Sequence, residues 1–171
     1  KKLGRNLTQE DLINFQAEYV NPIKIDYNGY EVYECPPNGQ GIVALMMLNM
    51  LSNINFTKYD PSDYRRIHIE AEVSKLAFLH RNKYLGDPKF SDIPVEKMLS
   101  KDYGLYLSQK INETSVLQNL NIRKLENNKD TVYISIVDNK GNFVSFINSI
   151  FHPFGSGKVT ENTGILLHNR G

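Results

Sequence analysis

Two alternating apolar segments on either side of a short polar turn constrain the fold of this chain more than any other feature. Residues Thr131–Val137 alternate in the way a strand requires, and Phe143–Ser149 follow after the turn Asn139–Asn142. Successive side chains of a strand point to opposite faces, and a short turn containing glycine between two such runs is typical of a hairpin. The sequence therefore predicts an antiparallel hairpin that is headed by a threonine, Thr131, and buried in the fold.

The position of Thr131 suggests a specific chemistry. It stands where a polar segment, Asn112–Lys129, meets the strand. Cleavage of the Asp130–Thr131 bond would leave Thr131 with a free amine beside its hydroxyl, and an α-amino group with a pKa of about 7.7–8.0 can act as a base near neutral pH. Nucleophile and base would then belong to one residue, as in self-cleaving N-terminal-nucleophile enzymes. The alternative is that Thr131 is a β-branched residue that simply suits a strand.

Several other segments favour the catalytic interpretation, because together they resemble one family. Gly29–Gly41 (GYEVYECPPNGQG), Tyr84–Pro88 (YLGDP), Phe154–Gly157 (FGSG) and Gly164–Asn169 (GILLHN) resemble, in order and spacing, sequence blocks of the γ-glutamyltranspeptidases. The resemblance runs from Leu7 to the last residue. It implies an α+β fold, part of the αββα sandwich of the N-terminal-nucleophile hydrolases, made as a precursor that cuts itself into a large and a small subunit.

The resemblance also implies roles for individual residues. Residues 1–130 would be the C-terminal part of the large subunit and residues 131–171 the N-terminal part of the small one, within one structural domain truncated at both ends. Thr131 would be the catalytic nucleophile and base, the bond after Asp130 the site of self-cleavage, and Ser149 the hydroxyl residue that orients the nucleophile. The family's oxyanion donors, and the arginine that grips the substrate's α-carboxylate, would lie outside this sequence.

Two residues depart from the family pattern at positions that bind substrate. Phe151 stands where well-studied members place an asparagine that binds the substrate's α-amino group, and Arg170 stands where they place a glutamine with the same task. An aromatic ring and a cation are poor partners for an ammonium group, which needs hydrogen-bond acceptors. Three functions therefore stay open: γ-glutamyl transfer from glutathione-type amides to water, an amino acid or a peptide; a broader amide hydrolysis resembling that of the cephalosporin acylases; and a non-catalytic role for an uncleaved homologue.

Composition argues against several other classes. Lysine and arginine number 20 against 19 acidic residues, with no basic run interleaved with aromatic residues, so neither a nucleic-acid nor a membrane surface is expected. His68, Glu70 and Glu72 lack the spacing of a zinc motif, so we expect no metal and no cofactor. The expected partners are a small-molecule acyl amide substrate and, after self-cleavage, the other subunit of a large–small heterodimer. The single cysteine, Cys35, is expected to pack as a small hydrophobe.

The remaining segments predict several helices and one further hairpin. Asn38–Gly41 are interpreted as a tight turn that needs glycine, with an anion site at a helix start as the alternative. Strands are expected at Ile23–Tyr27 and Tyr30–Cys35 around the favoured turn Asn28-Gly29. Helices are expected at residues 8–20, 42–51, 60–82, 95–99 and 102–111; in the longest, the face predicted to pack carries Tyr64, Ile67, Ala71, Ser74 and Phe78.

Overall fold

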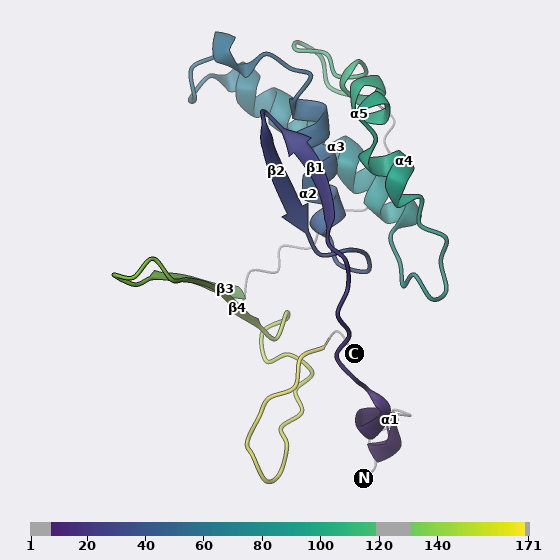
Figure 1. Ribbon diagram of the computed structural model, residues 1–171, viewed down its shortest axis with the longest axis vertical. Helices are drawn as coiled ribbons and strands as arrows, with labels where there is room; N and C mark the ends of the chain where they lie inside the picture. Colours follow the sequence, from purple (N-terminus) through teal and green to yellow (C-terminus); the bar gives the residue numbers. More distant parts are fainter. Residues whose placement is uncertain (1–7, 119–130, 170–171) are drawn as a thin grey trace. The chain divides into compact units, whose positions relative to one another are not determined.

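A computed structural model describes residues 8–118 and 131–169 of the chain (Figure 1). The chain divides into two compact units, Lys1–Ile122 and Arg123–Gly171, and each is described by itself. The first contains helices and a β-hairpin, and the second contains another β-hairpin followed by irregular turns. This mixture of helices and antiparallel strands is the α+β class that the sequence predicts. Within the described ranges, no helix is both long and apolar enough to cross a membrane.

The first unit begins with a short helix and a β-hairpin and continues with helices. Most of its predicted elements are confirmed. The first helix is shorter than predicted, and Phe15 and Tyr19, which the prediction placed within it, lie beyond its end and are exposed. In chain order the elements are α1 (Gln9–Asn14), β1 (Ile23–Tyr27), β2 (Tyr30–Glu34), α2 (Gly41–Leu51), the 3₁₀ turn η1 (Phe56–Lys58), α3 (Tyr64–Tyr84), α4 (Val95–Leu99) and α5 (Lys101–Ser108).

The β1–β2 hairpin is closed by the turn that the sequence predicts. Asn28 and Gly29 both have positive φ, 52° and 85°, as a type I′ turn requires. The strands pair antiparallel, with Tyr27 opposite Tyr30. Cys35, directly after β2, is exposed, so the prediction of a packed thiol is wrong. The alternation of the strand places this side chain on its exposed face.

Gly41 begins α2 at a point of close approach to the hairpin. A Cβ at this position would lie 2.6 Å from Oε2 of Glu34, so only glycine fits without displacing that side chain. The start of α2 therefore already faces an acidic group. The structure favours the tight-turn interpretation of Asn38–Gly41 over the anion site.

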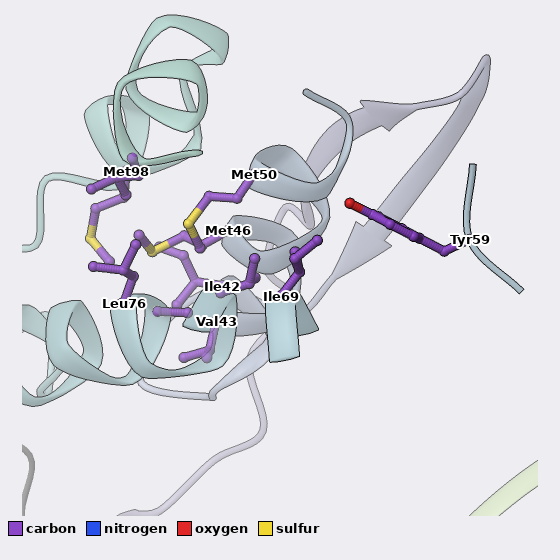
Figure 2. Packing of buried hydrophobic residues seen from close by; sticks show 11 residues of the cluster. Ile42, Val43, Met46, Met50, Tyr59, Ile69, Leu76 and Met98 are labelled. Carbon is purple, nitrogen blue, oxygen red and sulfur yellow. The ribbon is translucent and has the colours of Figure 1, made fainter. Parts of the chain in front are cut away.

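Helix α2 lies at the centre of the core of the first unit (Figure 2). It is apolar nearly all round, as the sequence predicts, and Ile42, Leu45 and Met50 are fully buried. Figure 2 shows Met46 and Met50 of α2 beside Met98 of α4, where flexible thioether side chains can fill an irregular gap. The other elements that pack on α2 are α3, α5 and the β1–β2 hairpin. They contribute buried side chains that include Ile25, Ile69, Val73, Leu76, Ala77 and Leu107.

Helix α3 differs from its prediction in both its start and its packed face. The carbonyl of Asp60 accepts a hydrogen bond from the Asp63 amide at 2.9 Å, which closes a turn before the helix. The Asp63 carboxylate then accepts from the Arg65 amide at 2.8 Å and caps the helix. The predicted face is largely exposed, with Tyr64 at 77% and Ile67 at 59%. Both stripes have helical spacing, and packing against α2 buries the other one: Ile69, Glu72, Val73, Leu76 and Ala77.

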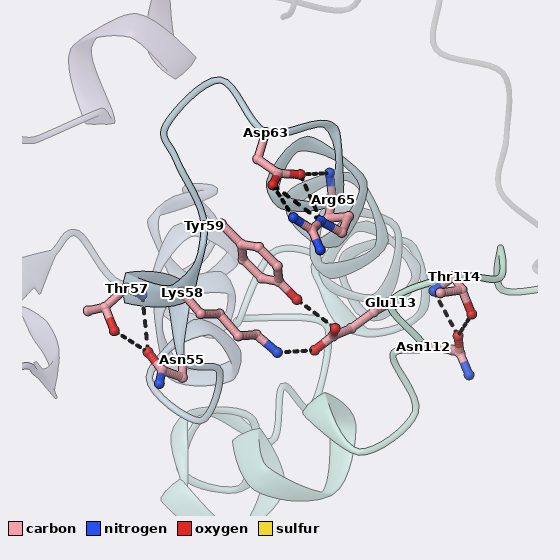
Figure 3. A network of polar contacts seen from close by, with 9 residues as sticks. All are labelled: Asn55, Thr57, Lys58, Tyr59, Asp63, Arg65, Asn112, Glu113 and Thr114. Carbon is pink, nitrogen blue, oxygen red and sulfur yellow. Dashed lines mark hydrogen bonds and ion pairs between the residues drawn. The ribbon is translucent and has the colours of Figure 1, made fainter.

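A network of polar contacts fixes the loop after α5 to the 3₁₀ turn and to α3 (Figure 3). Glu113 accepts hydrogen bonds from Lys58 Nζ and from the Tyr59 hydroxyl, both at 2.6 Å. The hydrogen bond from Lys58, followed by that from Tyr59, holds the pKa of Glu113 below its ordinary value. His68, a residue considered for metal binding, instead has Nε2 2.9 Å from the carbonyl oxygen of Asn112.

Glu72 ties the same loop to α3 from inside the protein. Its side chain is 2% exposed, forms an ion pair with Lys75, and accepts a hydrogen bond from the Leu117 amide at 2.8 Å. Burial by itself would raise the pKa of this carboxyl group. The hydrogen bonds from Lys75 and Leu117 outweigh burial, so the pKa lies below its ordinary value and Glu72 stays charged at neutral pH.

The second unit begins with the hairpin of β3 (Thr131–Val137) and β4 (Phe143–Ser149). Its turn is organised by Asp138, whose Oδ1 accepts from the amides of Lys140 and Asn142 at 2.8 and 2.9 Å. The strands and their antiparallel pairing are as predicted. Their expected burial is wrong for the described residues, because every residue of β3 is exposed and no described layer of the second unit covers it.

We predict that Glu72→Gln lowers the free energy of unfolding by about 1.5–3 kcal/mol at pH 7, the usual contribution of hydrogen bonds to a charged group. A carboxyl whose pKa is depressed on folding contributes stability above its unfolded pKa and loses it as pH falls through the folded value. The deficit should therefore shrink below pH 4.5, the ordinary value. Urea denaturation at pH 7 and pH 3.5 measures both effects.

The matched control is Glu70→Gln on the same helix. Glu70 pairs with Arg66 at 3.0 Å with 48% of its side chain exposed, so its loss should cost less than about 1 kcal/mol. Equal losses for the two variants, or a Glu72→Gln deficit that does not change with pH, would contradict the assignment.

Candidate active site around Thr131

Strand pairing in the second unit brings Thr131 opposite Ser149. The two are register partners at the open end of the hairpin, and Thr131 Oγ1 donates a hydrogen bond to Ser149 Oγ at 2.9 Å. Directly opposed residues of an antiparallel pair lie on the same face, which explains the contact. The structure thus brings together two hydroxyls that the sequence assigns to one site, and their catalytic roles stay a prediction. Asp130 and Arg170 lie outside the described residues.

Ser149 also contacts Phe151, the position predicted to bind substrate. The Phe151 backbone amide donates to Ser149 Oγ at 3.0 Å. Phe151 has φ 74°, a left-handed conformation that is uncommon outside glycine. Its ring meets that of His152 edge to face, with centroids 4.8 Å apart. The nucleophile candidate and the specificity candidate are therefore joined through one serine oxygen.

A compact turn follows Phe151 and brings the FGSG and GILLHN segments together. The Ser156 amide and its hydroxyl both donate to the carbonyl oxygen of Leu167 at 2.8 Å. The His152 amide donates to Asn169 Oδ1 at 3.3 Å. Gly155 has φ 50°, and a Cβ there would lie 2.4 Å from the Leu167 carbonyl oxygen. This glycine therefore permits the close approach of the two segments.

The face of the hairpin that carries Thr131 bears further hydroxyl groups. Tyr133 lies two residues along β3, hence on the same face, and its hydroxyl accepts a hydrogen bond from Ser145 at 2.9 Å. Hydrogen bonds from Ser135, and then from Ser145, lower the pKa of Tyr133. These residues were not predicted as part of a site, although their strand positions place them beside it.

The arrangement suits a hydroxyl nucleophile. A hydroxyl group offers one donor and two acceptor lone pairs, so Ser149 can hold the Thr131 oxygen in one orientation while a lone pair of that oxygen faces a carbonyl carbon. Thr131 is exposed, so a carbonyl group can approach it. In the part of the chain that the structure describes, no group of three or more histidine, cysteine, aspartate or glutamate residues is placed to hold a metal ion.

In the first unit, a polar depression lies between the start of α2 and the end of α3. It is lined by Asn38, Gln40, Arg81, Asn82, Leu85, Gly86 and Asp87. The Arg81 guanidinium already donates to Gln40 Oε1 and to Asn82 Oδ1, both at 2.9 Å. The contact with Gln40 links the PPNGQG segment to the last turn of α3, which leads into the YLGDP segment.

Comparison with known proteins shows what the chain is similar to. All of its residues, 1–171, match the family model described as Gamma-glutamyltranspeptidase. The Glutathione hydrolase-like YwrD proenzyme of Bacillus subtilis (strain 168) is 38% identical over 168 residues, which is 98% of this chain and 31% of that protein. The Glutathione hydrolase proenzyme of Escherichia coli (strain K12) is 36% identical over 176 residues, 99% of this chain and 30% of that protein.

A solved structure supports the same relationship. The crystal structure of cephalosporin acylase from Bacillus halodurans is similar with a TM-score of 0.78 and 41% sequence identity, and the match covers 96% of this chain and 29% of that one. This chain therefore spans about a third or less of the proteins it resembles.

We predict that Gly155→Ala destabilises the second unit much more than Gly157→Ala. Both glycines have positive φ, 50° and 67°, but a Cβ at Gly157 would meet nothing within 4 Å. Gly157→Ala should cost about 1 kcal/mol from the left-handed backbone alone. Gly155→Ala adds a clash with backbone and should lower the unfolding temperature clearly further. Thermal unfolding of the intact protein measures both, and equal shifts would show that the turn is not packed as described.

Proposed function

We propose that this chain, which belongs to the gamma-glutamyltranspeptidase family within the N-terminal-nucleophile hydrolases, contributes the nucleophile of a self-activating acyl-transfer enzyme. The observation that carries the proposal is the hydrogen bond between Thr131 Oγ1 and Ser149 Oγ at 2.9 Å. A threonine that directly follows Asp130 is thereby held by a second hydroxyl at the head of a strand.

Self-cleavage is the first reaction of the proposed enzyme. The Thr131 hydroxyl oxygen attacks the carbonyl carbon of Asp130, and the C–N bond breaks as the nitrogen takes up a proton. Asp130 is then held to Thr131 by an ester instead of an amide. Water hydrolyses the ester, leaving Asp130 with a carboxylate and Thr131 with a free hydroxyl and a free amine. Residues 1–130 and 131–171 would then belong to the large and small subunits of a heterodimer.

Acyl transfer uses the same oxygen. The new α-amino group, with an ordinary pKa of about 7.7–8.0, accepts the hydroxyl proton while the oxygen attacks the substrate's amide carbonyl. The amine of the substrate leaves with a proton, and the acyl group stays on Thr131 as an ester. Water or an acceptor amine then removes it. Oxyanion donors and the remaining substrate contacts are expected from outside this sequence, so the described residues would not suffice for turnover.

The acyl group has two candidate identities. The family relationship and the glutathione hydrolase relatives support a γ-glutamyl group taken from glutathione-type amides. The aromatic pair of Phe151 and His152 next to Ser149, together with the similarity to cephalosporin acylase, supports a broader amide hydrolase acting on acyl groups without an α-amino group. Arg170 also favours an acyl group without an α-amino group, because a guanidinium cation repels an ammonium group. A non-catalytic, uncleaved homologue is the third possibility that the test below addresses.

We predict that the intact protein appears as two pieces on a denaturing gel and that Thr131→Ala appears as one. Thr131→Ser keeps a hydroxyl and should still be cut. N-terminal sequencing of the smaller piece should read Thr-Val-Tyr-Ile. Normal cleavage of Thr131→Ala would exclude Thr131 as the nucleophile, and a wild-type protein that never divides would support the non-catalytic homologue.

The acyl group is tested by comparing a γ-glutamyl anilide with a glutaryl anilide, which differ in the α-amino group. Phe151→Asn should raise the ratio of kcat/KM for γ-glutamyl over glutaryl substrate, because the amide oxygen can accept from an ammonium group. A shift of roughly tenfold corresponds to about 1.4 kcal/mol of differential transition-state binding. An unchanged ratio would remove Phe151 from the acyl site.

A further inference from the structure

We propose that Phe151 positions the nucleophile through its backbone, in addition to any contact of its ring with substrate. Its amide holds Ser149 in the orientation that meets Thr131, and its left-handed conformation connects that amide to the anchored turn that follows. This inference rests on the proposed function, because it assigns a task within the self-cleavage reaction. Phe151 acts through Ser149 and is therefore a positioning residue.

The contacts of the Ser149 oxygen are the first argument. Ser149 Oγ accepts from Thr131 Oγ1 at 2.9 Å and from the Phe151 amide at 3.0 Å. A serine side chain at a strand end can occupy any of three staggered χ1 rotamers unless a contact selects one. The Phe151 N–H is fixed to the backbone, so its hydrogen bond selects one of them. In the other rotamers the oxygen would leave Thr131 without this partner.

The backbone of Phe151 is the second argument. A bulky residue with φ 74° is an outlier, and such conformations persist only where the surrounding structure enforces them. Here the turn is held from its far side, since the His152 amide donates to Asn169 Oδ1 at 3.3 Å and the Gly155 amide donates to the His152 carbonyl at 2.7 Å. The Phe151 amide reaches back to a residue only two positions earlier, at the end of β4, and the left-handed φ of Phe151 directs the chain that follows into the anchored turn.

A second phenylalanine in the same turn, Phe154, serves as a control. It distinguishes an effect on Ser149 from an effect on formation of the turn. Phe154 also has positive φ, 62°, and is 79% exposed. Its amide is three residues further from Ser149 along the chain. Replacing either phenylalanine by valine creates the same conflict, because a β-branched side chain tolerates the left-handed region poorly. Only the change at residue 151 should disturb Ser149.

The experiment measures the first-order rate of self-cleavage of the full-length precursor on denaturing gels. Phe151→Val should slow cleavage about tenfold, equivalent to about 1.4 kcal/mol in the activation free energy. Phe151→Asn should cleave faster than Phe151→Val, because asparagine tolerates the left-handed conformation better than a β-branched residue does. Phe154→Val should stay within about twofold of wild type. In a Ser149→Ala background, followed over days, Phe151→Val should add less than about twofold, because the oxygen through which it acts is gone.

Three results would overturn the proposal: wild-type cleavage by Phe151→Val, equal slowing by Phe154→Val, or a Phe151→Val effect that persists undiminished in the Ser149→Ala background. Thermal unfolding of each precursor checks folding, and Phe151→Ala, a smaller side chain with the same backbone conflict, replaces Phe151→Val if the valine variant does not fold. The failure of the proposed function is distinct, since it would be seen as cleavage of Thr131→Ala or as no cleavage of the wild type.

Discussion

The register of β3 against β4 decides whether this chain has a candidate active site. Thr131 and Ser149 are 18 residues apart in sequence and meet only because they are exact partners across the hairpin. A slip of one residue would turn one of the two side chains to the opposite face. The register is set at the other end of the hairpin, where the Asp138 carboxylate accepts from backbone amides of the turn and Gly141 adopts φ 81°. Turn chemistry at one end thus fixes the hydroxyl pair at the other.

The first unit is held together differently, by burial around α2 and by acids that bind the loop after α5. Glu113 and Glu72 contact this loop from two sides, one at the surface and one inside. These two acids therefore fix the segment after α5 to the helices of the first unit.

The relatives carry the names glutathione hydrolase and cephalosporin acylase, so family membership leaves the identity of the acyl group open. In the proposed function that choice depends on Phe151 and Arg170, and Phe151 lies within the described residues.

Sequence reasoning succeeded where local chemistry decides the structure. Asn28-Gly29 favours a type I′ turn, the apolar segment 42–51 favours a buried helix, and a two-strand pattern around a polar turn predicts the hairpin, in which the family resemblance placed Ser149 beside Thr131. It failed where tertiary packing chooses between equal local options. Helix α3 carries two apolar stripes, and only the presence of α2 selects the buried one. The positive φ of Phe151 has no signal in the sequence, because the residue type argues against it and the surrounding turn imposes it.

The alternation along β3 and β4 divides this hairpin into two sides with different chemistry. The side with Thr131 carries the hydroxyl residues Tyr133, Ser135, Ser145 and Ser149 together with Val137, Phe143 and Ile147, while the other side carries Val132, Ile134, Ile136, Val144, Phe146 and Asn148. The side that carries Val132, Ile134 and Ile136 can pack against another layer, because Thr131 and Ser149 lie on the opposite side of the hairpin. Substitutions on the side without Thr131 can therefore change how firmly the hairpin is packed, while substitutions on the side with Thr131 change the surroundings of the hydroxyl pair.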